Sequence, residues 1–102
     1  MAVLTFVSAK ISAHRQDEVI HPYSEAMTRG LPPELRQTFL VVGDDDTMAI
    51  ATVWHRREDL DAMLESGEEP FARRLLREAG GETEARFIEI RAEGPRRQSD
   101  PK

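Results

Sequence analysis

His21 and Tyr23 are two side chains that could exchange a proton and donate a hydrogen bond. They lie two residues apart in a stretch with helical periodicity. An imidazole titrates near neutral pH, so His21 is a candidate base, and the Tyr23 hydroxyl could bind a ligand beside it. The alternative places His21 on the surface and Tyr23 in the core, with its hydroxyl at the rim.

Arg86 is the second candidate catalytic residue. It shares a strand parity with Ile88 and Ile90. Its guanidinium could therefore face an interior and bind an enolate or a carboxylate. A salt bridge across a dimer is the alternative role for this side chain.

Trp54 and Ser8 join Tyr23 as candidate substrate-binding residues. Trp54 is the only tryptophan of the chain, and it ends a strand-like run. It could form the aromatic wall of a pocket or close the core. Ser8 shares its strand parity with Leu4 and Phe6, and could offer a hydroxyl to a ligand.

Other catalytic and metal-binding patterns are missing. The chain has no cysteine, which excludes disulfides, thiol catalysis and Cys-ligated metals. The three histidines lack the His-x-x-x-His spacing of a zinc site, and the run Asp44–Asp46 lacks the Gly and Glu spacing of a calcium loop. No serine sits in a Gly-x-Ser-x-Gly turn. We therefore expect no metal site.

Composition limits the class of protein and its partners. The chain has 102 residues, of which 39% are hydrophobic and 32% charged, which describes one globular domain. Its net charge of −5 argues against nucleic acid as a partner, because binding phosphates requires clustered basic residues. No apolar run approaches the roughly 20 residues of a membrane span. We expect a cytoplasmic protein with neither nucleic-acid nor membrane partners.

Arg73, Arg74 and Arg77 form one positive stripe. Glu69 precedes Arg73 by four residues, which is the spacing of a helical ion pair. Glu78 follows Arg74 at the same spacing. The pattern favours a solvated helix face over a phosphate-binding patch.

Hydrophobic periodicity predicts a β-α-β-β-α-β order. Ser12 offers an N-cap to the first helix, and Pro22 within it predicts a kink or an early break. Gly67 with Pro70 interrupts the second helical region, and Gly80-Gly81 ends it. The expected elements are a strand at Val3–Ile11, a helix at about His14–Arg29, strands at Gln37–Gly43 and Thr47–Trp54, helical segments starting near Arg57 and at Phe71, and a strand at Glu84–Arg91.

This order is typical of the α+β, ferredoxin-like fold, in which a four-stranded antiparallel sheet carries both helices on one face. The first three strands are apolar on both parities, so the opposite face also needs cover. Dimerisation through that face is the simplest solution. The domain is expected to span residues 1–93, and residues 94–102 are expected to form a disordered tail.

Over about residues 1–93, the element order and the region after the third strand resemble the antibiotic biosynthesis monooxygenase family of the dimeric α+β barrel superfamily. The shared features are Trp54 at the strand end, a short polar link, a helix of the type at Asp59–Leu64, and Phe71 two turns later. The resemblance implies a homodimer with a pocket between sheet and helices in each subunit. Haem-degrading relatives use an asparagine of the first strand, and this chain contains no asparagine.

The resemblance implies a monooxygenase that needs neither metal nor flavin. It would oxidise a small phenolic, quinol or polyketide-like aromatic with O₂, the substrate supplying the electrons. Two alternatives stay open: a non-catalytic dimeric protein that binds a small hydrophobic aromatic ligand, and an isomerase or cyclase on the same scaffold.

Overall fold

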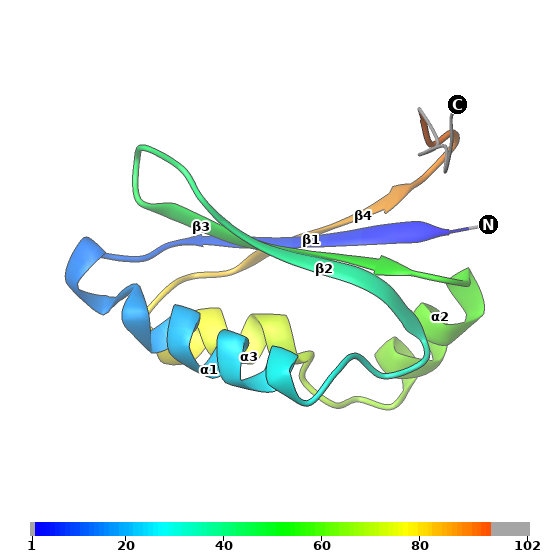
Figure 1. Ribbon diagram of the computed structural model, residues 1–102, viewed down its shortest axis with the longest axis horizontal. Helices are drawn as coiled ribbons and strands as arrows, with labels where there is room; N and C mark the ends of the chain where they lie inside the picture. Colours follow the sequence, from blue (N-terminus) through cyan, green and yellow to red (C-terminus); the bar gives the residue numbers. More distant parts are fainter. Residues whose placement is uncertain (1, 95–102) are drawn as a thin grey trace, which may run out of the picture.

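A computed structural model describes residues 2–94 of the chain. One antiparallel sheet forms the first layer, and three α-helices cover one of its faces (Figure 1). The elements are, in chain order, β1 (Val3–Lys10), a 3₁₀ turn (Ala13–Arg15), α1 (Asp17–Thr28), β2 (Leu35–Val42), β3 (Thr47–Trp54), α2 (Arg57–Glu65), α3 (Phe71–Glu78) and β4 (Glu84–Glu89).

The sheet has the order β2-β3-β1-β4, and all neighbouring strands are antiparallel. In the central pair, Val3 lies opposite Trp54 and Lys10 lies opposite Thr47. A bulge between Leu35 and Gln37 interrupts the pairing of β2 with β3. This topology confirms the predicted ferredoxin-like α+β fold.

The core lies between the sheet and helices α1 and α3. Alternate side chains of β1 and β3 point toward the helices, because successive strand residues face opposite sides. They meet one apolar stripe from each helix. The buried cluster consists of Val7, Ala9, Ile11, Val19, Tyr23, Met48, Ile50, Leu75, Leu76 and Ala79.

The first helix differs from the sequence-based expectation at both points of detail. A separate 3₁₀ turn follows Ser12, whose side chain makes no capping hydrogen bond, and α1 starts only at Asp17. Of the kink or early break expected at Pro22, the break does not occur, since α1 continues through Pro22 to Thr28. One missing backbone donor is tolerated because Val19 and Tyr23, on either side of Pro22, are buried against the sheet.

Two glycines end α3 and turn the chain toward β4. The Gly80 N–H donates to the Arg77 carbonyl, and the Gly81 N–H donates to the Leu76 carbonyl. This pair of bonds is a Schellman motif, which needs a left-handed residue at its first position. Gly80 supplies that residue with φ +95°. The motif places Gly81 directly against β1.

The sheet face opposite the helices is open in one protomer. Leu4 and Phe6 of β1 lie on it, and Phe39, Val41 and Ile88 are 45%, 46% and 42% exposed there. Isolated exposed apolar residues are ordinary, but a row of them across neighbouring strands marks a surface that binds something. As expected from the sequence, these strands thus carry apolar side chains on both faces of the sheet.

Two further expectations meet the structure only in part. Of the expected tail at 94–102, only Gly94 falls within the described residues. Within residues 2–94, no helix is long and apolar enough to cross a membrane.

Candidate functional site

A cavity of about 970 Å³ lies between the sheet and the helices, toward the end of the sheet where α2 and α3 separate. Its volume is within the range of small-molecule sites. Its walls are mainly apolar. The wall residues include Val7, Tyr23, Ala26, Met27, Leu35, Ile50, Trp54, Met63, Leu64, Phe71, Ala72 and Phe87.

Trp54 is fixed at the sheet wall of the cavity by a hydrogen bond. It ends β3 on the helix-facing parity, and its indole Nε1–H donates to the Thr5 Oγ1 of neighbouring β1 at 3.2 Å. Thr5 is buried, and its own hydroxyl lies 3.5 Å from the Thr52 carbonyl oxygen. The polar end of the indole is thus satisfied within the protein, and the ring is held at one orientation.

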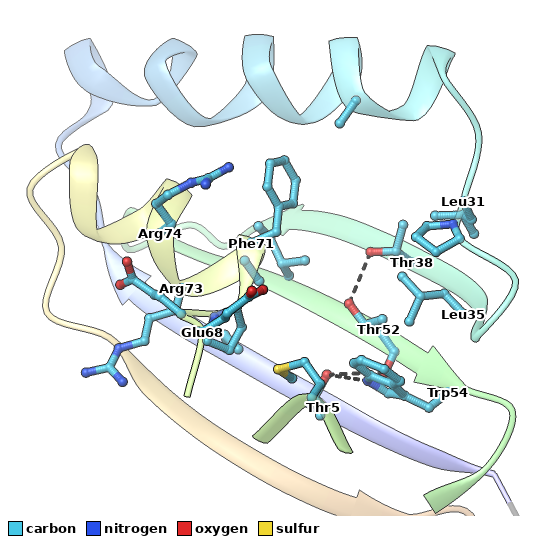
Figure 2. Close-up of a pocket in the computed structure, with 18 of the residues that line it drawn as sticks. Thr5, Leu31, Leu35, Thr38, Thr52, Trp54, Glu68, Phe71, Arg73 and Arg74 are labelled. Atoms are coloured by element: carbon cyan, nitrogen blue, oxygen red, sulfur yellow. Dashed lines mark hydrogen bonds between the residues drawn. The ribbon is translucent and has the colours of Figure 1, made fainter. Parts of the chain in front are cut away.

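A row of hydroxyls crosses the same wall. The Tyr23 hydroxyl donates to Thr38 Oγ1 at 3.2 Å. Thr38 Oγ1 in turn lies 3.4 Å from Thr52 Oγ1, a contact drawn as a dashed line in Figure 2. Thr38 and Thr52 are directly opposite each other in the β2–β3 ladder. Each hydroxyl can both donate and accept. This hydroxyl row could therefore bind an oxygen atom of a ligand, and it carries no charge of its own.

Charged groups lie at the rim of the cavity: Arg29, Glu68, Glu69, Arg73 and Arg74. Glu69 is engaged by Arg77, whose guanidinium donates to its two carboxylate oxygens at 2.7 and 2.8 Å. That hydrogen bond holds the pKa of Glu69 below its ordinary value, and the charges of Arg73 and Arg74 act in the same direction. The Arg74 guanidinium lies 5.5 Å from the centre of the Phe71 ring.

Known proteins match this chain in structure. No family model and no curated protein matches the sequence. A single-residue variant of SnoaB, a cofactor-independent oxygenase from Streptomyces nogalater, matches with a TM-score of 0.66 at 12% identity, over 93% of this chain and 98% of that one. A conserved protein from Methanosarcina mazei matches with a TM-score of 0.67 at 14% identity, over 86% and 91% of the two chains.

A candidate antibiotic biosynthesis monooxygenase from Deinococcus radiodurans is also similar. It matches with a TM-score of 0.60 at 14% identity, over 95% of this chain and 99% of that one. The chain has the antibiotic biosynthesis monooxygenase fold. At these identities the likeness establishes the fold, and the chemistry has to be argued from the cavity.

The antibiotic biosynthesis monooxygenase fold brings two of the five predicted site residues together. Trp54 and Tyr23 both line the cavity. His21 is exposed on α1 and does not line it, because residues two apart on a helix point in very different directions. Ser8 and Arg86 lie on the open face of the sheet. Arg86 is therefore exposed and does not face the interior that its strand parity had suggested, since the cavity-lining residues of β4 are Ala85 and Phe87.

Thr5, Thr38 and Thr52 were not among the residues predicted from the sequence. A signal was available, because each is a threonine at a helix-facing position among apolar neighbours. Within residues 2–94, no group of three His, Asp or Glu side chains could hold a metal ion. The cavity therefore offers a ligand aromatic and aliphatic contacts, neutral hydroxyls inside, and charged groups at its rim.

A Thr5→Val variant tests how the indole is held. Valine keeps the shape of threonine and removes the acceptor of the Trp54 N–H, so we expect the free energy of unfolding to fall by about 1–2 kcal/mol. Urea denaturation followed by the fluorescence of Trp54 measures the change. Thr83→Val is the matched control, because Thr83 is half-buried and makes no side-chain hydrogen bond within the described part of the chain. Equal stability of the two variants would show that this bond contributes nothing.

Proposed function

We propose that the protein is a member of the antibiotic biosynthesis monooxygenase family and oxidises a phenolic, quinol or polyketide-like aromatic with O₂, without a cofactor. The observation that carries this proposal is the combination of an apolar cavity of about 970 Å³ with a row of neutral hydroxyls that runs from α1 onto its sheet wall. SnoaB, which shares the fold, is a cofactor-independent oxygenase. An aromatic ring fits the apolar walls, and its oxygen substituents fit the hydroxyl row.

The proposed reaction needs no reductant besides the substrate. In an anthrone, O₂ converts the CH₂ group between the two aromatic rings to a ketone. One oxygen atom enters the product, and the other leaves as water with the two hydrogens of the CH₂ group. All four electrons come from the substrate. The protein therefore has to bind the ring, favour its deprotonated form and keep bulk water away.

The hydroxyl row is suited to the second of these tasks. Deprotonating a phenol or its keto tautomer puts negative charge on oxygen, and O–H donors aimed at that atom stabilise the charge. Tyr23 and Thr38 lie on two different elements, α1 and β2, so their positions are set by the packing of helix on sheet. Trp54 from the sheet and Phe71 from α3 supply ring contacts.

Steady-state O₂ uptake with 1,8-dihydroxy-9-anthrone tests the proposal. We expect uptake above the spontaneous rate, with one O₂ consumed for each quinone formed. His21→Ala and Arg86→Ala are expected to retain this activity because both side chains lie outside the cavity. Loss of activity in either variant would support the catalytic role that the sequence suggested for that residue. Uptake no faster than in protein-free buffer would reject the monooxygenase.

The side chains that line the cavity also support a second candidate function, the binding of a ligand without catalysis. The polar side chains inside the cavity are hydroxyls and the Trp54 indole, and the charged side chains are exposed at its rim. This suits a non-catalytic protein that binds a small aromatic ligand. Saturable binding of the anthrone without O₂ consumption would favour this function, and a rearranged product formed without O₂ would favour an isomerase or cyclase.

We further propose that the protein is a cytoplasmic homodimer formed through the open face of the sheet. The support is the row of exposed apolar side chains on neighbouring strands, together with a chain of 102 residues that buries limited surface by itself. A chain without cysteine is suited to a reducing compartment.

A pair of neighbouring substitutions tests the dimer. Val41 and Val42 are 46% and 48% exposed, but Val41 lies on the open face and Val42 on the helix-facing side. In light scattering we expect the wild type and Val42→Lys at twice 11.6 kDa, and Val41→Lys at 11.6 kDa, because a lysine buried in the dimer would be unpaired. A wild-type mass of 11.6 kDa would exclude the dimer.

A further inference from the structure

The rim of the cavity has more positive charge than its own carboxylates neutralise. Of the charged lining residues, Glu69 is engaged by Arg77, which is not part of the lining. Arg29 lies 3.9 Å from Glu25. This leaves Glu68 as the remaining carboxylate against Arg73 and Arg74.

Arg73 and Arg74 have no carboxylate within 4 Å among residues 2–94. Helical spacing had suggested Glu69 as the partner of Arg73. That pairing is wrong, because α3 starts at Phe71 and Glu69 precedes the helix. From there its carboxylate reaches Arg77, one turn beyond Arg73. Two cations that follow each other in sequence are thus left at the edge of an aromatic cavity, in a chain whose net charge is −5, and their side chains diverge, with Arg74 on the side of Phe71 (Figure 2).

Arg74 is also positioned next to the part of the cavity that would hold a ring. Its guanidinium lies over Phe71, and Figure 2 shows both side chains on the helix side of the cavity. Stacking on a ring leaves the N–H edges of a guanidinium free to donate, and these edges match the geometry of a carboxylate. A ligand with its ring in the cavity would therefore present its edge to this group.

We propose that the ligand of the cavity carries an anionic group, such as a carboxylate, which Arg74 binds at the rim, while Arg73 adds positive charge nearby. The inference rests on the proposed function, since it assumes an aromatic ligand in the cavity. It narrows the ligand class from neutral aromatics to aromatic acids. Glu68 opposes the same anion, so its removal should strengthen binding.

Binding of two matched ligands tests this proposal. Anthraquinone-2-carboxylate and anthraquinone-2-carboxamide differ in charge and are nearly equal in size, and quenching of Trp54, the only tryptophan, reports on both. We expect the wild type to bind the carboxylate roughly tenfold more tightly at low ionic strength. We expect the preference to shrink as salt is added, because the two arginines are exposed.

Three variants assign the preference to the rim. Arg73→Gln/Arg74→Gln is expected to abolish the preference and to leave the affinity for the carboxamide unchanged. Glu68→Gln is expected to tighten carboxylate binding about two- to threefold. Arg57→Gln removes one positive charge on α2, outside the cavity lining, and is expected to change neither affinity.

The outcomes separate this inference from the proposed function. Equal affinities for the two ligands in the wild type, or a carboxylate preference that survives the double substitution, would overturn the anion site and leave the aromatic cavity intact. Binding of neither ligand would overturn both. A preference that Arg73→Gln/Arg74→Gln abolishes and Glu68→Gln increases would establish the anion site.

Discussion

Gly81→Ala is expected to destabilise the fold by about 2–3 kcal/mol. A Cβ atom at this position would lie 2.6 Å from the Cβ of Ala9, 2.7 Å from Cδ1 of Ile11 and 3.1 Å from the Leu76 carbonyl oxygen. Ala9 and Ile11 are buried, and the carbonyl belongs to the helix backbone, so none of these atoms can move cheaply. Chemical denaturation followed by circular dichroism measures the loss.

Gly94→Ala is the control for that experiment. Nothing lies within 4 Å of a Cβ built on Gly94. We expect this variant to stay within about 0.5 kcal/mol of the wild type. If Gly81→Ala were equally stable, α3 and β1 could not pack as closely as the structure has them.

Ala26→Trp is expected to weaken aromatic ligand binding by at least about tenfold, or 1.4 kcal/mol. Ala26 is a half-buried residue of α1 that lines the cavity. A bicyclic ring at this position occupies the space that the ligand needs, and an α-helix accepts tryptophan at little cost. Calorimetric titration with anthraquinone-2-carboxylate is the suitable measurement, because a second tryptophan would complicate fluorescence.

Ala62→Trp provides the matched control. Ala62 is exposed on α2 and does not line the cavity. We expect wild-type affinity and wild-type O₂ uptake in this variant. Full binding by a stably folded Ala26→Trp would place the ligand somewhere other than this cavity.

The sequence predicted most of the fold because its strands and helices differ clearly in hydrophobic period. The strand at Thr47–Trp54 was predicted with the bounds of β3. The last strand was predicted to reach Arg91, but β4 ends at Glu89. Its length depends on its partner, since Glu89 lies opposite Val3, where β1 starts. The end of β4 therefore depends on its pairing with β1 and cannot be predicted from the residues of β4 alone.

Only those residues of the candidate site whose position follows from a local sequence pattern could be predicted. Tyr23 lies on the apolar stripe of a helix, and Trp54 ends a recognisable strand, so both could be placed at the core. The Thr38–Thr52 contact depends on the register of two strands and on a bulge near Leu35. Arg73 lacks the ion pair with Glu69 that helical spacing suggests, because α3 starts at Phe71 and Glu69 lies before it. These are properties of tertiary structure.

Labelled oxygen tests directly whether the protein transfers an oxygen atom from O₂ to an aromatic substrate. The protein would be incubated with 1,8-dihydroxy-9-anthrone under ¹⁸O₂ in ordinary water, and the quinone analysed by mass spectrometry after rapid quenching. We expect one ¹⁸O atom in each quinone, and we expect the quinone to form faster than in protein-free buffer and more slowly with Ala26→Trp. Quinone formation at the protein-free rate, or protein-dependent product without the label, would contradict this oxygen transfer.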